Sequence, residues 1–405
     1  MLLGIAWRNI WRNKKRSIVL LTAIALGLCG GVFSTGVMVG MTESMVNTGI
    51  DRYLGHLEIH TKSFKENPLV NDFIVEGDTV AAYLRSMNDV RGVSSRTIIE
   101  GMASSPTTNT GVQIVGINPR DESLVTTNAQ RIVDGKYLSD AGRFPVFVGK
   151  KLAEKLGLRL RSKLVLSFAG RDGSIVYGSF RIIGVFETES SAFDKTTLFI
   201  RRSDIEELLG GNPLVHEIAV RLKSAESVPH FLATVRGLYP HLAVDSWKDL
   251  APDLKFMAEV TDIYMLFFVG VVLLGLLFGI TNTMLMSVLD RMREFGVLMA
   301  IGMKRKRIFW LVMLETVFLS LTGGIVGIVV AVIGIDITNR TGIDLSIVAE
   351  GLSSYGISTM LYPFIPTLMY FEIAILVILT ALGAAIYPGI KATKLNPAAS
   401  IRTYA

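Results

Sequence analysis

Long apolar runs divide this chain into four candidate membrane spans and one large segment between the first two. A helical run of about 20 apolar residues is long enough to cross the hydrocarbon core of a bilayer. Such runs cover 18–42, 260–289, 308–335 and 369–390. The first is too long for the core of a secretory signal peptide, so we expect it to be kept as an anchor. The pattern predicts an α-helical membrane protein with four transmembrane helices.

Basic residues gather in three segments beside these runs, at 1–17, 290–307 and 391–405. The three segments hold five, six and three Lys and Arg residues, respectively, and only two acidic residues, whereas the whole chain has a net charge of +6. Basic residues next to spans are retained in the cytoplasm. We therefore expect these segments and both termini to be cytoplasmic. The positive charge then reflects membrane topology and does not indicate a surface for nucleic acid.

The segment between the first two spans, 43–259, is long enough to fold as a domain on the other side of the membrane. Alternating β-branched runs mixed with amphipathic stretches predict a large α+β domain. The single cysteine of the chain, Cys29, lies within the first span. This position excludes a disulfide or a thiolate metal site in the domain.

A quasi-repeat suggests two subdomains. A strand, a helix and a strand are predicted at 56–61, 79–90 and 94–105, and again at 215–223, 226–238 and 242–247. We expect these units to form one split α/β subdomain, about 55–110 and 212–248, around an insert subdomain at about 111–210. Helical stretches at 45–53 and 247–261 continue into the spans without a flexible linker. Such stalks could transmit movement across the membrane, and a static anchor for a sensor domain is the alternative.

One hairpin of the insert has a turn composition at its tip. The tip residues Gly170, Arg171, Asp172 and Gly173 lie between two predicted strands. Exposed loop tips often carry binding functions. We therefore expect this tip to contact a partner.

The basic segment 290–307 lies between the second and third spans. Met292, Phe295, Met299 and Met303 recur within it at helical spacing. This spacing predicts a short amphipathic helix that lies along the membrane or against a partner protein.

Glu315 is an acid inside the third span. It lies about 10 Å from the cytoplasmic end at 1.5 Å per residue. A carboxylate in a span costs roughly 2.5 to 3.5 kcal/mol, less near the interface, so we expect it to have a partner. Glu315 could be an intramembrane polar pin between the cytoplasmic loop and the helix bundle. A snorkelled or water-exposed acid is the alternative.

The sequence predicts no catalytic activity for this chain itself. The Gly-Lys pairs at 135–136 and 149–150 lack the other residues of a phosphate-binding loop, so ATP and magnesium would bind to another polypeptide. His56, Glu58 and His60 alternate on one face of a predicted strand. That pattern is typical of a polar sheet face more often than of a metal site. We predict no catalytic, cofactor or metal residues.

The segment Asp290–Met303 resembles the coupling segment of the MacB/FtsX-type, or mechanotransmission, ABC transporter permeases. The matching residues are Arg291, Glu294, Gly296, Ala300 and Gly302, and Glu315 matches an acid in the following span. The tail from Pro388 to Arg402 is similar to the terminal pattern of that family. The resemblance implies a non-catalytic inner-membrane permease with four spans, a periplasmic domain, a partner ATPase and a second permease. It assigns ATPase coupling to Arg291, Arg293, Glu294, Phe295, Gly296, Ala300 and Gly302, with Gly296 leaving room for the partner.

Within that family the stretches 55–60 and 146–157 look most like the lipoprotein-releasing LolC/LolE group. This likeness implies release of lipoproteins from the inner membrane to a periplasmic carrier. The hairpin tip is shorter than the chaperone-binding hook of one permease of that group. MacB-like efflux of peptides or amphiphiles through an adaptor, and FtsX-like control of a cell-wall hydrolase, remain alternatives.

Overall fold

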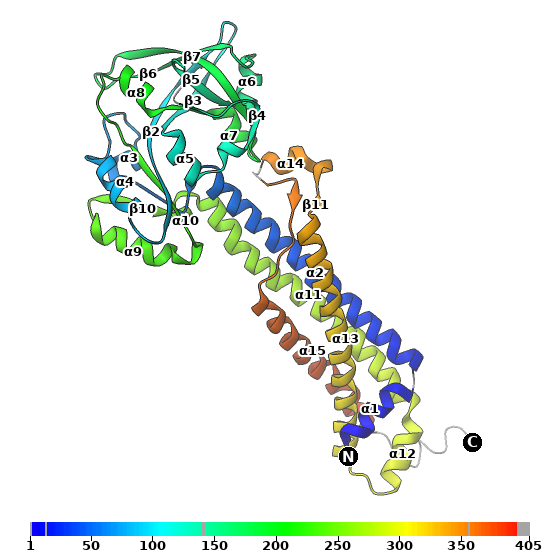
Figure 1. The fold of residues 1–405 in the computed structure, drawn as a ribbon. Helices are drawn as coiled ribbons and strands as arrows, with labels where there is room; N and C mark the ends of the chain where they lie inside the picture. Colours follow the sequence, from blue (N-terminus) through cyan, green and yellow to red (C-terminus); the bar gives the residue numbers. More distant parts are fainter. Residues whose placement is uncertain (1, 13, 140–141, 355–356, 395–405) are drawn as a thin grey trace. The chain divides into compact units, whose positions relative to one another are not determined.

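The computed structural model describes residues 2–12, 14–139, 142–354 and 357–394. The chain divides into two compact units (Figure 1). The helical unit comprises 1–42, 259–344 and 360–405, and the α+β unit comprises 43–258 and 345–359.

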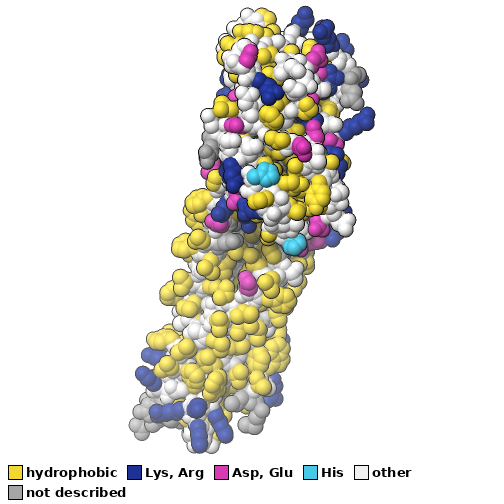
Figure 2. All heavy atoms as spheres, turned by 90° about the vertical axis from the view of Figure 1, so that its left-hand side faces the viewer, with side chains coloured by type: hydrophobic (Ala, Val, Ile, Leu, Met, Phe, Trp, Pro, Cys, Tyr) yellow, Lys and Arg dark blue, Asp and Glu magenta, His cyan; other side chains and the backbone are white. Residues whose placement is uncertain are grey.

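Four helices are long and apolar enough to cross a membrane, and they extend over Ser17–Leu54, Pro252–Asp290, Arg305–Thr341 and Thr367–Thr393. The helical unit is formed by α1 (Leu2–Arg12), α2 (Lys14–Gly49, which continues into the α+β unit), α11 (Pro252–Asp290, whose first residues lie in the α+β unit), α12 (Met292–Ala300), α13 (Arg305–Thr341) and α15 (Thr367–Thr393). A two-residue pair of strands, β11 (Ile343–Asp344) and β12 (Met360–Leu361), joins the loop ends between α13 and α15. Figure 2 shows hydrophobic side chains over most of this unit and Lys and Arg side chains at the end that carries α12.

Glycines bring α13 against α2. A Cβ built at Gly327 would lie 2.7 Å from the backbone oxygen of Ala25, and one at Gly323 would lie 3.1 Å from the side chain of Ile24. Small residues of this kind let two membrane helices approach closely.

The α+β unit has one sheet system in two parts. Its strands are β1 (Leu57–Thr61), β2 (Val90–Ser104), β3 (Asn109–Ile117), β4 (Ile132–Gly135), β5 (Pro145–Gly149), β6 (Lys163–Ala169), β7 (Ile175–Phe186), β8 (Thr197–Arg201), β9 (Glu217–Leu222) and β10 (Leu242–Ser246). The first part has the antiparallel order β10-β1-β9-β2. In the second part the far half of β2 pairs with β3 and β6, and the strands close in the order β2-β3-β8-β5-β7-β6.

Short helices surround the sheets: α3 (Lys62–Glu66), α4 (Gly77–Arg85), α5 (Pro119–Val125), α6 (Lys150–Leu156), α7 (Ser191–Thr196), α8 (Arg202–Leu208), α9 (Val228–Leu238), α10 (Trp247–Leu250) and α14 (Ala349–Ser354), with single turns η2 (Asn128–Gln130), η3 (Ala225–Ser227) and η4 (Ser346–Val348). The structure contains the two predicted strand–helix–strand units. They are β1-α4-β2 and β9-α9-β10, and they share one buried core. Strand β2 belongs to both parts of the sheet. The chain therefore enters the insert along this strand and not through a linker.

The two stalks differ. Helix α2 continues to Gly49 and ends in a π-helical turn, η1 (Ile50–Leu54). The second stalk is interrupted, because Ala251 separates α10 from α11. A π-turn at a helix end is a local change of helical geometry that is frequent at functional positions.

Candidate functional site

The sequence explains where helix α12 ends. Ile301 and Gly302 close it, with Gly302 at a φ of +97°, a conformation that suits glycine. The backbone nitrogens of Gly302 and Met303 donate to the carbonyls of Met299 and Leu298 at 3.1 and 2.9 Å. This pattern is a Schellman motif, which stops the helix and turns the chain toward α13.

One face of α12 packs against its own chain and the opposite face is free. Phe295 is buried, with 1% of its surface exposed, whereas Val297 is 47% and Ile301 75% exposed. Arg293 and Ala300 are also exposed. Together with Val297 and Ile301 they recur at helical spacing. The free face is therefore a largely apolar surface at the basic end of the helical unit, which suits a protein partner.

Gly296 is one of the residues that the resemblance assigns to ATPase coupling. It is buried in the structure, as is its neighbour Phe295, and its role in coupling stays a prediction. The exposed side chains of α12 are the ones available to another protein.

A buried ion pair ties α12 to the third span. The guanidinium of Arg291 donates to both carboxylate oxygens of Glu315 at 2.8 and 3.0 Å, and to Glu294 at 2.9 Å. The side chains of Arg291 and Glu315 are only 12% and 6% exposed. The amide of Asn9 donates to the same Glu315 carboxylate at 2.6 Å. Glu315 is thus neither snorkelled nor water-exposed, and its charge is fully partnered.

A second ion pair is exposed. Arg12 at the end of α1 pairs with Glu294 of α12, and their side chains are 55% and 44% exposed. Partial burial opposes the charged form of Glu294, but hydrogen bonds from Arg12 and Arg291 outweigh it and hold the pKa of Glu294 below its ordinary value. Glu294 is therefore ionised at neutral pH and bridges the two arginines.

Helix α1 is amphipathic and packs on the bundle. Ala6 and Ile10 are buried in the helical core, and the Trp7 ring meets Phe318 edge-on at a centroid distance of 5.9 Å. The hydroxyl of Ser17 donates to the carbonyl of Ile10 at 2.6 Å. These contacts fix the face of α1 that carries Asn9 and Arg12.

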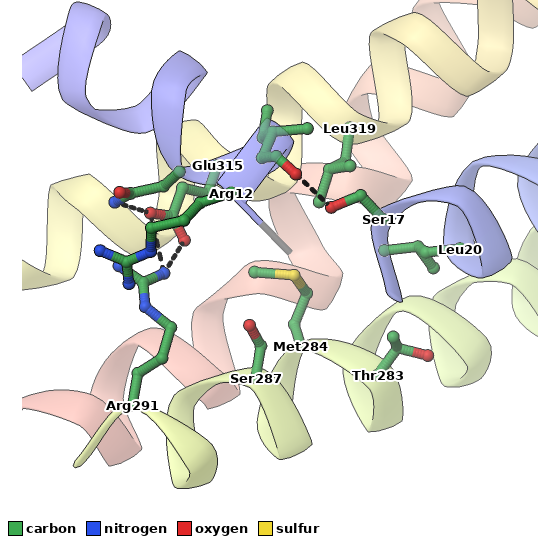
Figure 3. A pocket seen from close by; sticks show the side chains of 11 residues that line it. Arg12, Ser17, Leu20, Thr283, Met284, Ser287, Arg291, Glu315 and Leu319 are labelled. Carbon is green, nitrogen blue, oxygen red and sulfur yellow. Dashed lines mark hydrogen bonds and ion pairs between the residues drawn. The ribbon is translucent and has the colours of Figure 1, made fainter. Parts of the chain in front are cut away.

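Figure 3 shows the resulting pocket, in which Arg12, Arg291 and Glu315 converge. Its lining comes from α1, α2, α11, α13 and the residue before α12: Asn9, Ile10, Arg12, Ser17, Leu20, Thr283, Met284, Ser287, Arg291, Glu315 and Leu319. The described lining residues have no nucleophile held by a base. The arrangement can instead hold α12 in one position relative to α1 and α13.

The structure brings Arg291, Glu294, Phe295 and Glu315 together, and it leaves Arg293, Ala300 and Gly302 exposed. Sequence reasoning missed Asn9 and Arg12. The sequence signal for them was their spacing. Asn9 and Arg12 lie three residues apart on a helix whose other face carries Ala6 and Ile10.

The predicted hairpin tip folds back on its own unit. The backbone oxygen of Arg171 accepts a hydrogen bond from Asn71 at 2.9 Å, and its guanidinium lies 5.3 Å from the ring centroid of Phe73. Gly170 is buried, whereas Asp172 and Gly173 are exposed. Two of the four tip residues are therefore open to a partner.

The alternating side chains of β1 have separate partners. His56 accepts from the backbone of Leu222, and His60 lies 3.3 Å from Asp245. Glu58 lies 4.0 Å from Arg96, a wholly buried arginine that sequence reasoning also missed. Three buried carboxylates surround Arg96: Glu58, Glu122 and Glu217.

Comparisons with known proteins agree with this architecture. Residues 266–397 match the family model described as FtsX-like permease C-terminal, and 17–238 match MacB-like periplasmic core domain. An uncharacterised ABC transporter permease of Methanocaldococcus jannaschii is 25% identical over 67% of this chain and 65% of its own length. A pyoverdine export ATP-binding/permease protein of Pseudomonas fluorescens is 24% identical over 85% of this chain and 53% of its own.

The chain thus spans between about half and two-thirds of these relatives. Among solved structures, the periplasmic region of MacB from Actinobacillus actinomycetemcomitans aligns with a TM-score of 0.37 at 12% identity, over 51% of this chain and 94% of that one.

Proposed function

Because this chain belongs to the MacB/FtsX-type ABC transporter permeases, we propose that it couples ATP hydrolysis by a separate ATPase subunit to movement of its α+β unit. The observation that carries this proposal is the construction of α12. Its inner face is fixed by Phe295 and by the Arg291–Glu315 pair, and its outer face is free and largely apolar. A helix held in this way can pass a displacement to the spans without bending separately from them.

The ATPase would dock on the free face. Val297 and Ile301 supply apolar contact area, and Arg293 adds a positive charge beside them. ATP and magnesium would be held by the ATPase, and this chain would supply no catalytic group. The ion pairs of Arg291 would keep the face in register during docking.

The same proposal fixes the topology. The end with α12 and both termini would face the cytoplasm of a bacterium, and the α+β unit would face the periplasm, as the distribution of Lys and Arg supports. A second permease, identical or homologous, would complete the membrane part. The strongly exposed apolar residues of α11, such as Phe267 and Phe278, are available for that contact or for lipid.

For the cargo we propose lipoproteins, released from the inner membrane toward the outer membrane with the help of a periplasmic carrier. The support is the likeness of 55–60 and 146–157 to the lipoprotein-releasing permeases. The second candidate is export of a periplasmic amphiphile, favoured by the match to the pyoverdine exporter over 85% of this chain. Control of a cell-wall hydrolase without transport is the third.

Coupling is tested with the assembled complex in lipid nanodiscs. Val297→Asp should abolish ATPase docking and the ATPase activity that depends on the permease. Val133→Asp, at a valine of β4 that is 53% exposed, is the matched control and should behave as wild type. Normal activity in Val297→Asp would contradict the docking assignment.

Cargo is tested by depleting the chain in cells and separating the two membranes. Outer-membrane lipoproteins retained in the inner membrane would support lipoprotein release. An unchanged lipoprotein distribution with loss of export of a small amphiphile would favour the second candidate, and a division defect with neither change would favour hydrolase control.

A further inference from the structure

The outer surface of β2, β6 and β7 forms a mixed apolar and basic patch in the α+β unit. We define the β6–β7 face as Met102, Lys163, Val165, Ile175, Tyr177 and Arg181. The register of the three strands places them on one side. Ser167 is the partner of both Met102 and Tyr177, and Lys163 is the direct partner of Arg181.

The apolar part of this face is unusually open. Tyr177 and Ile175 are 66% and 63% exposed, and Met102 and Val165 are 43% and 40% exposed. Small residues lie between them, Ser167 and Ala169 on β6 and Gly111 on β3, and Glu100 adds one exposed carboxylate beside Met102 on β2. The face is therefore flat and uncovered, whereas the inward residues of the same strands, such as Leu166 and Phe180, are fully buried.

The basic part lies at one end of the face. Lys163 and Arg181 are both exposed and directly opposite each other, and neither takes part in an ion pair among the described residues. Like charges at directly opposed positions destabilise a sheet. Arg161 adds a third exposed cation nearby, since its backbone nitrogen donates to Ile182 at 2.8 Å. A carboxylate placed between these cations would remove the repulsion.

We propose that the β6–β7 face is the docking surface for a protein that presents an apolar surface with carboxylates at one edge. The proposal rests on the proposed function, because it names the surface that receives the periplasmic partner. Tyr, Met and Arg are enriched at protein interfaces, and Tyr and Arg are also enriched at their energetic centres. A bound phosphate would use the cations alone and leave Tyr177 and Ile175 uncovered.

This assignment differs from docking at the hairpin tip. The tip is held by Asn71, so only Asp172 and Gly173 are open there. A stable interface buries about 800 Å² on each partner, far more than two tip residues supply. The β6–β7 face supplies a continuous centre for such an interface, and the tip would lie at its rim.

The test is photocrosslinking in cells from the full-length chain with a photoreactive amino acid at Tyr177. We expect an adduct with a protein whose crosslinked peptide contains Asp or Glu. The same label at Val133 should not give this adduct. The double variant Lys163→Glu and Arg181→Glu should lower the yield about tenfold or more, because it repels the acidic edge.

The matched control is Lys136→Glu with Lys195→Glu, which changes the net charge equally at two exposed lysines outside the face and should leave the yield unchanged. Replacing the crosslinked acid of the partner by Lys should restore the adduct of the double variant. A missing adduct, an adduct with lipid or with a second copy of this chain, or a yield indifferent to charge reversal would each overturn the proposal. ATPase activity of the complex reports coupling separately and should be normal in the face variants, so a failed adduct with normal ATPase activity leaves the coupling function standing.

Discussion

The sharpest test of the helical unit is to break the buried pair between Arg291 and Glu315. Replacing Glu315 by Leu removes a carboxylate that is 6% exposed and leaves the Arg291 guanidinium, 12% exposed, with only Glu294 as a counter-charge. Removing one partner of a buried ion pair costs about 3 to 5 kcal/mol. Because Glu294 remains, we expect a loss near the lower end, about 3 kcal/mol.

Removing both charges should recover most of this loss. A buried ion pair replaced by apolar residues of similar volume is often neutral for stability. In the double variant Glu315→Leu with Arg291→Met, Asn9 still loses its acceptor, which leaves about 1 kcal/mol unrecovered. Glu294 keeps its partner Arg12. The double variant is thus expected to be stable but to lack the link between α12 and the third span.

The assay is denaturation of the full chain in mixed micelles, followed by tryptophan fluorescence, because Trp7, Trp11 and Trp310 all lie in the helical unit. Glu372→Leu, at an exposed glutamate of α15, is the matched control and should change stability by less than about 0.5 kcal/mol. Permease-dependent ATPase activity of the complex is measured in parallel. A Glu315→Leu variant as stable as the control would refute the buried-pair reasoning. Full coupling in the double variant would limit the pair to a structural role.

Three further predictions use other parts of the chain. Arg12→Ala should cost at most about 1 kcal/mol in the same assay, and the loss should shrink in high salt, because the Arg12–Glu294 pair is exposed; a salt-independent loss would show that Arg12 acts through packing. Burial and the neighbouring Glu217 raise the pKa of Glu58 well above 4.5, so the protonated form is favoured by folding and stability falls as pH rises from about 4.5 through the folded pKa; thermal unfolding from pH 5 to 8 should show a smaller decline in Glu58→Gln, and equal declines would contradict this. In a Cys29→Ser background, single cysteines at Ser174 and Ser346 should react with an impermeant thiol reagent in spheroplasts and one at Thr393 should not; labelling at Thr393 would reverse the topology.

The spans were predictable because apolar length is a local property of the sequence. Helix α12 begins at Met292, where the methionine and phenylalanine spacing predicts it, and α15 extends only a few residues beyond the predicted fourth span. The strand, helix and strand units were visible for the same reason. The strands β3 and β4 were not predicted, because turns and register set them as much as composition does.

The site was only half predictable, because its remaining members are distant in sequence. The chain reverses direction between Arg291, just before α12, and Glu315 on α13. A partner for Glu315 could therefore be expected nearby. Asn9 is 306 positions from Glu315, and the amphipathic pattern of α1 does not say which helix it meets. The buried state of Arg96 depends on carboxylates from β1, α5 and β9, which no local pattern connects.

The strengths of these contacts indicate which contact should break first when α12 is displaced. Charged side chains make contacts before the start and at the end of the long helix Ser17–Leu54. Before its start, Arg12 on α1 contacts α12 through an exposed pair that is worth about 1 kcal/mol or less. At its other end, Asp51 pairs with Arg221 at 2.5 Å, and the Tyr53 ring lies 4.7 Å from the guanidinium of the wholly buried Arg96. Breaking that buried network would cost several kcal/mol. A push on α12 should therefore open the exposed Arg12–Glu294 pair first, while the Tyr53 end of the helix stays fixed to the sheet.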